Sequence, residues 1–270
     1  MSTCAALSAA SDEPMSGTAA HAPLVVGVEV STRWAAKALE SDALAPIRNE
    51  LGAWLAAHGA RLQLVRQPAR RCEEGNRFCF VSVPGRDGWL RAGEASLETL
   101  VETLDALHRG EGDERVLRLV CAHGTRDRCC ALEGTAYYQS ASNDEDLWLT
   151  SHIGGHRFAP TMLVLPSGLC YGRLAHDDDS LAPPREKLRG RVSYEQRVQA
   201  AEIALLRAHP ELDLDAFELD AAGETVTFRG ALGVVGVDVH EGPALPARML
   251  SCGDEPSARV PWQATIQESP

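Results

Sequence analysis

The chain of 270 residues is long enough for one large domain or two ordinary ones, and its 44% hydrophobic and 24% charged residues match an average soluble protein. Its formal net charge of −12 repels phosphate backbones, so nucleic acid is not expected as a partner, whereas a basic protein would suit this surface. No apolar run approaches the roughly 18 residues that a membrane-spanning helix needs, so no membrane association is expected.

The cellular compartment is predicted from the N-terminus and the cysteines. The first 23 residues have neither a basic start nor a long apolar stretch, so no secretory signal is expected and the predicted location is cytoplasmic. Reduced thiols are then expected instead of disulfides, and such thiols are buried small hydrophobes or metal ligands. The cysteines are Cys4, Cys72, Cys79, Cys121, Cys129, Cys130, Cys170 and Cys252.

The N-terminal half begins with residues 1–22, which are rich in Ala, Ser and Gly and are expected to be a flexible segment. Apolar residues at helical or strand spacing, with Gly59 and Gly110 as helix ends, then predict the order β-α-β-β-β-α for residues 23–112. The predicted elements are a strand at 24–30, a helix at 44–58, strands at 61–66 and 77–83, a short strand near Trp89 and a helix over 97–107.

The same order is predicted again for residues 113–210. Ser193 is expected to cap the last helix, with Gln196 completing a capping box, and residues 175–190 are expected to be an exposed polar linker. The predicted elements are a strand at 115–120, a helix near 132–140, a strand at 146–151, a hairpin of strands 161–166 and 169–174, and a helix that ends before Pro210.

The order β-α-β-β-β-α is that of the thioredoxin fold. The fold class is therefore predicted as α/β, with two tandem thioredoxin-like units at 23–112 and 113–210 and a small β extension at 211–270. A hairpin of residues 224–230 and 234–240 is expected to add an edge or a cap to the second unit. The stretch FAPTMLVLPSG resembles the thioredoxin segment that carries a cis-proline, which would be Pro160 and would lie beside the loop after residue 120.

Two residue pairs carry the candidate chemistry. Cys121 and Cys130 are separated by eight residues, and His152 and His156 by three. Thiolates combined with imidazoles select zinc or an iron–sulfur cluster. A loop of eight residues is wide for one zinc ion, whose cysteines usually come from a tight turn, and fits better with a [2Fe–2S] cluster, which spreads its ligands.

The motifs VCAHGTRDRCC (120–130) and SHIGGHRFAPTMLVLPSGLCYGRL (151–174) resemble the sucrase/ferredoxin-like family. The resemblance implies a thioredoxin-like [2Fe–2S] protein with two cysteine and two histidine ligands. It further implies that residues 113–210 are the ferredoxin domain and that the unit at 23–112 has no cluster. Carried over by position, these ligands are Cys121, Cys130, His152 and His156. The word sucrase implies no chemistry here, because the sequence has no recognisable carboxylate pair for glycoside cleavage.

Other residues of the two motifs have competing interpretations. Arg126, Arg128 and Arg157 could offset negative charge at a cluster or be ordinary surface arginines, while Asp127 is expected to cap a helix. Cys129 could replace Cys130 as a ligand, although a structural role is the better expectation. His123 is expected to be a solvated loop residue. Core or surface thiols are the simplest interpretation of Cys72, Cys79, Cys170 and Cys252.

The function predicted from the sequence is an iron–sulfur electron carrier or redox component that works with a redox partner protein. Whether the chain also turns over a substrate of its own is not predicted. Neutral imidazoles in place of two thiolates raise the potential and allow the electron to be coupled to an imidazole proton. The alternatives are a zinc-stabilised thioredoxin-fold binding module and a thioredoxin-like thiol oxidoreductase, and the latter lacks its Cys-x-x-Cys motif. The electron donor and acceptor and the oligomeric state are not predicted.

Overall fold

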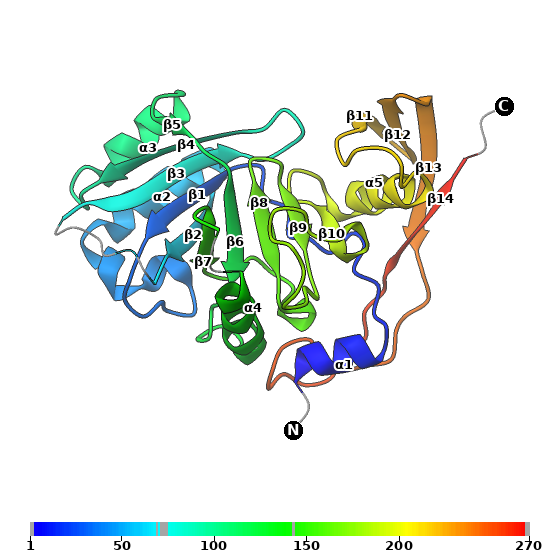
Figure 1. Ribbon diagram of the computed structural model, residues 1–270, viewed down its shortest axis with the longest axis horizontal. Coiled ribbons are helices and arrows are strands. Elements are labelled where there is room, and N and C mark those ends of the chain that lie inside the picture. Colours follow the sequence, from blue (N-terminus) through cyan, green and yellow to red (C-terminus); the bar gives the residue numbers. More distant parts are fainter. Residues whose placement is uncertain (1–2, 69, 71–74, 142–143, 268–270) are drawn as a thin grey trace.

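The computed structural model describes residues 3–68, 70, 75–141 and 144–267, so Cys72 lies outside the described residues. Figure 1 shows a large curled sheet across most of the molecule and a smaller sheet beside it. The large sheet contains β1 (Val25–Glu29), β2 (Arg61–Arg66), β3 (Arg77–Val83), β4 (Trp89–Ala95), β5 (Asp113–Glu114), β6 (Leu117–Cys121), β7 (Leu147–Thr150), β8 (Met162–Leu165), β9 (Leu169–Tyr171) and β10 (Leu188–Arg191).

The small sheet and the helices complete the α/β architecture. The small sheet contains β11 (Phe217–Ala222), β12 (Thr225–Gly230), β13 (Gly233–Glu241) and β14 (Trp262–Ile266). The α-helices are α1 (Cys4–Ala10), α2 (Arg48–His58), α3 (Leu100–His108), α4 (Thr135–Ser140) and α5 (Gln196–Ala208). Shorter turns are η1 (Ala38–Glu40), η2 (Asp42–Ile47), the π-helical η3 (Cys130–Gly134), η4 (His156–Phe158) and η5 (Arg185–Lys187). Every helix of the described residues is too short or too polar to cross a bilayer.

The strand order of the large sheet is β10-β9-β8-β6-β7-β2-β1-β3-β4-β5. In the first half, β1 is parallel to β2 and antiparallel to β3, which is antiparallel to β4. In the second half, β6, β7, β8 and β9 are related in the same way. The halves join where β2 and β7 pair in antiparallel fashion, with Val65 opposite Thr150. Both halves therefore have one topology and share a continuous sheet.

Alternating residues of the strands divide the apolar side chains between the two faces of the sheet. Val26 and Val28 of β1 pack in one core with α2 and α3, whereas Val25 faces the other side. That second core joins the halves, because it holds Phe80 of β3 together with Leu119 of β6. Ala19 and Ala22 of the N-terminal segment also belong to it.

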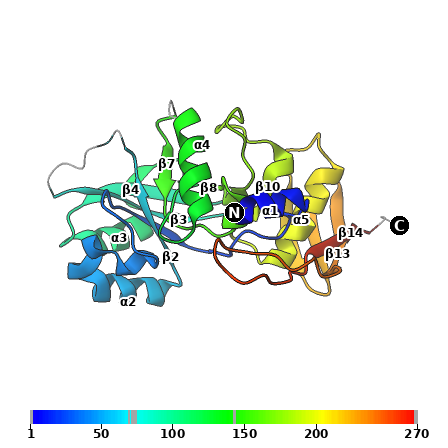
Figure 2. The ribbon, with the colours of Figure 1, turned by 90° about the horizontal axis from the view of Figure 1, so that it is seen from below.

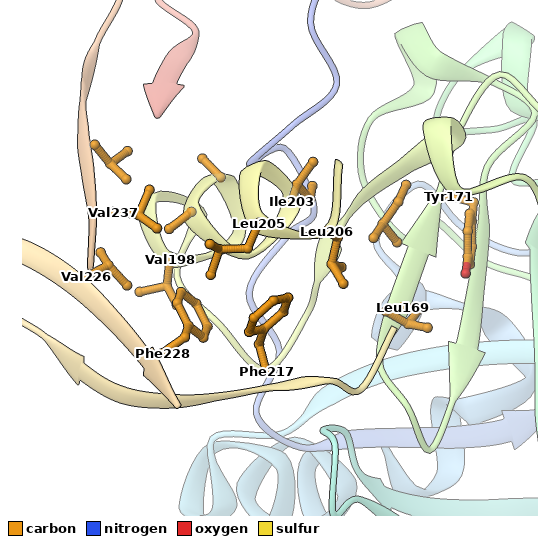
Figure 3. Close-up of a cluster of buried hydrophobic side chains, with 14 of the residues drawn as sticks. Leu169, Tyr171, Val198, Ile203, Leu205, Leu206, Phe217, Val226, Phe228 and Val237 are labelled. Atoms are coloured by element: carbon orange, nitrogen blue, oxygen red, sulfur yellow. The ribbon is translucent and has the colours of Figure 1, made fainter. Parts of the chain in front are cut away.

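Helix α5 lies between the two sheets. Figure 3 shows Val198 and Leu205 of this helix beside Val226 and Phe228 of β12, with Tyr171 of β9 on the other side of the same core. The small sheet therefore has its apolar face buried on α5. The predicted C-terminal hairpin is confirmed as β12 and β13, which pair in antiparallel fashion, and it caps α5 instead of extending the large sheet.

Most predicted strands and helices are present within a few residues of their expected bounds. The predicted hairpin of the second half is β8–β9, with Gly168 in its turn at φ +73°. The predicted cis bond before Pro160 is also present. Thr161, the next residue, accepts a hydrogen bond from the backbone N–H of Cys121 at 3.0 Å, so Pro160 lies beside the cysteine loop as expected.

Three segments differ from the prediction. The N-terminal segment forms α1 and buries Glu13 and Ala19, because polar groups elsewhere in the chain form ion pairs and hydrogen bonds with it. The end of the expected linker is strand β10, in which Arg189 and Arg191 are fully buried, so the prediction of an exposed linker is wrong there. The predicted capping box is also wrong. Helix α5 begins at Gln196, and its N-cap makes no side-chain hydrogen bond, because Tyr194 closes a turn onto Arg191 directly after β10.

Candidate metal centre

The loop of residues 121–130, which carries the two cysteines, begins at the end of β6 and folds back to it. Cys121 is the last residue of β6, and Cys130 begins the π-helical turn η3, so both thiols are buried at the same end of the sheet. Gly134 of η3 makes this return possible, because a β-carbon at that position would lie 1.9 Å from the Cys121 carbonyl oxygen. The structure thus brings together two cysteines that eight residues separate. Single π-helical turns of this kind are frequent at functional sites.

The first histidine reaches the same place from the neighbouring strand. Strand β7 is parallel to β6, so the segments that follow the two strands meet at one edge of the sheet. His152 lies two residues beyond β7, and its Nδ1 is 3.9 Å from the Sγ atoms of both Cys121 and Cys130. These three donor atoms lie within 4.8 Å of one another. The structure therefore gathers three of the four predicted ligands around one point.

The second histidine lies beside this group without joining it. The ring of His156 is 5.1 Å from that of His152 between centroids, and the two rings are tilted by 32°. Its Nε2 is 3.9 Å from Oδ2 of Asp127, whereas its Nδ1 is buried and has no hydrogen-bond partner among the described residues. A buried imidazole nitrogen without a partner is energetically unfavourable unless something else binds it.

The two glycines between the histidines shape this loop. Gly154 and Gly155 have φ angles of +91° and +75°, in the region that favours glycine. A β-carbon at Gly155 would lie 2.2 Å from the guanidinium of Arg189. That guanidinium is fixed, because it donates hydrogen bonds to the carbonyl oxygens of Gly154, at 3.0 Å, and of Thr18, at 2.6 Å. Arg189 thereby fixes the loop that carries His152 and His156. Sequence reasoning missed this role because Arg189 was assigned to the exposed linker.

Two further side chains hold the backbone of His152. Nδ1 of His123 accepts a hydrogen bond from the His152 N–H at 3.1 Å, while its Nε2–H donates to the Ala35 carbonyl at 2.8 Å. Arg61 donates to the His152 carbonyl at 3.0 Å. His123 is buried, so the prediction of a solvated residue is wrong, because both ring nitrogens find backbone partners. Burial lowers the pKa of His123 and favours the neutral ring that this arrangement needs.

The two thiols act on one another's ionisation. A hydrogen bond from the Cys130 thiol lowers the pKa of Cys121 well below its ordinary value, and the same interaction raises the pKa of Cys130. Burial lowers the pKa of His156, so its imidazole stays neutral near neutral pH. Metals bind thiolates and neutral imidazoles, so these shifts suit a ligand role for Cys121 and His156, whereas Cys130 would have to lose its proton when a metal binds.

The arginines and the aspartate that the sequence singled out have different surroundings. Arg126 and Arg128 are exposed, whereas Arg157 is partly buried and forms an ion pair with Glu13, Nε to Oε1, at 2.8 Å. Asp127 precedes a helical turn and accepts a hydrogen bond from the Cys129 N–H at 2.8 Å, which agrees with the predicted cap. The partly buried Arg61 interacts electrostatically with Cys121, whereas Arg189 donates a hydrogen bond to Sγ of Cys170 at 3.5 Å.

The structure separates the two adjacent cysteines. Cys130 lies with Cys121 and His152, while Cys129 lies with Cys4 and Cys252 in another group of thiols. The geometry therefore favours Cys130 over Cys129 as the partner of Cys121. Of the other cysteines, Cys79 and Cys170 are buried in the cores on the two faces of the sheet, as expected for structural thiols.

The donor set fits a soft metal centre. Two thiols and one imidazole already meet, and a second imidazole beside them has a buried nitrogen without a partner. Ile153 packs in the same core as the two cysteines and helps to exclude water from the site. Sulfur and imidazole donors select zinc or an iron–sulfur cluster over hard cations such as Mg²⁺. The residues present thus fit either group.

The fold and these donors define an α/β protein with a buried site of thiols and imidazoles. The chain belongs to the sucrase/ferredoxin-like family, whose sequence model matches residues 15–180, more than half of the chain. The match includes all four predicted ligands and ends before α5 and the small sheet. No curated protein and no solved structure matches the chain significantly.

Proposed function

We propose that the chain carries one [2Fe–2S] cluster on Cys121, Cys130, His152 and His156 and serves as an electron carrier or redox component. The observation that supports this most strongly is the meeting of two buried thiols and Nδ1 of His152 at the ends of β6 and β7. The unpartnered Nδ1 of His156, on the neighbouring ring, supplies a fourth donor. When bound, such a cluster takes up and releases one electron at a time.

The fold part of the proposal is that each half of the large sheet is a thioredoxin-like unit. The shared strand order and the helix between each pair of parallel strands support it. In this interpretation only the second unit carries the cluster, at the loop after its first strand. The first unit contributes Arg61, which fixes the His152 carbonyl, and the Ala35 carbonyl, which fixes His123.

The residues around the site have definite roles in this proposal. His123, Arg61 and Arg189 hold the loop that bears both histidines, so the ligands keep their positions when the charge of the site changes. The guanidinium group of Arg61 also offsets the negative charge of the Cys121 thiolate, which favours the reduced state. The acidic surface suits a basic redox partner protein. Coupling of the electron to an imidazole proton stays a prediction, to be tested by the dependence of the potential on pH.

A single zinc ion is the competing function, that of a metal-stabilised binding module. Cys121, Cys130 and His152 lie close enough together to share one tetrahedral ion, so the geometry that supports the cluster also supports zinc. A single zinc ion would need Nδ1 of His156 as its fourth ligand, and the imidazole would have to turn toward the other three donors. A thiol oxidoreductase is disfavoured, because the two cysteines of the site are not in a Cys-x-x-Cys motif.

Metal and sulfide analysis of anaerobically purified protein separates these functions. The cluster proposal expects roughly two irons and two acid-labile sulfides per chain at full loading, and a rhombic EPR signal of low average g after reduction with dithionite. His156→Cys should keep the iron and shift this signal, and Cys121→Ser should lose most of the iron. Cys79→Ser, which changes a buried thiol of β3, is the matched control and should alter neither. Colourless protein that takes up no iron and sulfide on reconstitution would reject the cluster.

A further inference from the structure

A second group of thiols lies near the candidate metal centre. Cys4 comes from α1, Cys129 from the helical turn before η3, and Cys252 from the segment between β13 and β14. Figures 1 and 2 both show this orange-red C-terminal segment beside α1. Together with Asp127 these residues are called the three-cysteine group below. Three segments that are far apart in the sequence thus bring one thiol each to a common point.

The three sulfurs form a nearly equilateral triangle. Sγ of Cys129 is 3.4 Å from Sγ of Cys4 and 3.4 Å from Sγ of Cys252, and the remaining side is 3.6 Å. Tetrahedral zinc with Zn–S bonds of about 2.3 Å holds its sulfurs about 3.8 Å apart. The triangle therefore needs to open by only a few tenths of an ångström to admit such an ion. Cys4 and Cys129 are 0% and 1% exposed, so these two thiols are shielded from water.

A carboxylate points into the same group. Oδ2 of Asp127 accepts hydrogen bonds from the Cys252 N–H at 2.8 Å and the Ser251 hydroxyl at 2.9 Å. Its Oδ1 accepts from the Cys129 N–H alone among the described backbone groups and lies 3.8 Å from Sγ of Cys4. Sγ of Cys4 is also 3.9 Å from Oδ2, so the carboxylate lies against this thiol while backbone hydrogen bonds fix its orientation.

We propose that the three-cysteine group is a second metal site, in which Cys4, Cys129 and Cys252 bind a zinc-type soft divalent cation and Oδ1 of Asp127 completes a closed tetrahedral set. Such a closed set has no open position for a substrate, so the ion is structural. Binding releases the thiol protons to solvent and leaves three thiolates around the cation. The ion fastens α1 and the C-terminal segment to the loop that carries Cys130.

The geometry favours a cation over a disulfide. A disulfide would draw two of the sulfurs to about 2.05 Å and would leave the third thiol and the carboxylate in the group without a role. It would also require an oxidant. A metal ion uses all four groups at once, and their donor atoms already lie within 4.8 Å of one another.

This site is separate from the four ligands of the proposed cluster. Cys4 and Cys252 lie outside residues 15–180, the part of the chain that matches the family. Asp127 links the two places, because its Oδ2 is also 3.9 Å from Nε2 of His156. An ion in the three-cysteine group therefore braces Asp127 and, through it, the second histidine of the neighbouring centre.

The test is the zinc and iron content of the full-length chain and its variants, purified from cells supplied with zinc and iron. Wild-type protein should carry about one zinc ion per chain in this group, held by three thiolates. The double variant Cys4→Ser/Cys252→Ser should lose that zinc and keep its iron. The variant Cys121→Ser should lose iron and keep the zinc, and Cys79→Ser should keep both. Protein without iron would therefore contradict the cluster proposal, whereas zinc that does not depend on Cys4 and Cys252 would contradict this one.

A second measurement needs no substitution, which matters if the double variant does not fold. X-ray absorption at the zinc edge of wild-type protein should show about three sulfur neighbours at about 2.3 Å and one lighter atom. Wild-type protein that binds no zinc after metal addition under reducing conditions would overturn the proposal. So would zinc retained in full by the double variant, or an intact mass showing that the native thiols form a disulfide.

Discussion

At the scale of single residues, Gly155 and Arg189 show how tightly the histidine loop is built. Replacing Gly155 by alanine combines a left-handed backbone with a clash against Arg189, whose guanidinium cannot swing away because backbone carbonyls hold it. We expect Gly155→Ala to lower the free energy of unfolding by about 3 kcal/mol and to reduce metal content. Urea denaturation and metal analysis check this.

The control for that prediction is Gly233→Ala. Gly233 also has a positive φ, of +81°, but a β-carbon there meets no atom within 4 Å. It should cost only the backbone strain, about 1 kcal/mol, and leave the metal content unchanged. Equal losses for the two variants would show that Arg189 does not constrain the loop.

Glu13 predicts a dependence of stability on pH. Burial alone would raise the pKa of Glu13, but hydrogen bonds from Arg248 and Arg157 outweigh it and lower that pKa below its usual 4.5. A carboxyl with a lowered pKa in the folded state stabilises the protein above its ordinary pKa, and this contribution is lost as the pH falls through the folded-state value. The N-terminal segment should therefore loosen in acid.

The variant Glu13→Gln tests this ion pair. Removing one partner of a buried pair costs about 3 kcal/mol near pH 7. The difference in unfolding free energy between wild type and variant should shrink as the pH falls below 4.5. Urea denaturation at a series of pH values measures it, and a difference that does not change with pH would contradict the role of the carboxylate. Glu218→Gln, which breaks an exposed pair with Arg86, should change little at any pH.

At the scale of elements, the periodic patterns were sufficient for most strands and helices, because apolar alternation and helical spacing follow from burial on one face. Two of the donors could be paired from local sequence alone, and the neighbouring loops could be placed together by topology. The failures have another cause. Arg189 and Arg191 in β10 are buried because distant groups satisfy their charges, namely the Thr18 carbonyl and Glu202. Charged residues in a short segment otherwise predict exposure.

The three-cysteine group also lay beyond sequence reasoning. Cys4 and Cys252 have no local pattern that points to Cys129, since their meeting depends on how α1 and the C-terminal segment pack. His123 was misjudged for the same reason, because its partners Ala35 and His152 lie on other segments. Only a conserved spacing between distant cysteines, read across many relatives, would have signalled such a group.

The packing of the small sheet on α5 should contribute strongly to the stability of the protein. Phe228 of β12 is fully buried against α5, as Figure 3 shows, so Phe228→Ala should destabilise the protein by about 3–5 kcal/mol. Val234→Ala on β13, where the side chain is 49% exposed, should change the stability by less than about 0.5 kcal/mol. Thermal and urea unfolding followed by circular dichroism compare the two. A small effect of Phe228→Ala would mean that the sheet is not coupled to the fold.

At the scale of the whole molecule, the two halves are expected to fold as one unit. Phe80 and Leu119 belong to a single core that crosses the boundary between residues 112 and 113, and β2 pairs with β7 across it. We therefore expect one cooperative transition for the full chain. A fragment of residues 113–270 should expose the shared core and bind a hydrophobic dye. If that fragment melts cooperatively without binding dye, the halves are independent domains.

The position of Cys252 in the chain sets an order of events during synthesis. The carboxylate of Asp127 is held by the backbone N–H of Cys252, a residue translated 125 positions later. During synthesis on the ribosome, the loops that carry the cysteines and histidines are therefore made before this hydrogen bond can form. We therefore expect the proposed metal sites to stay open to incoming metal until the C-terminal segment has been synthesised, and the packing of that segment to close them.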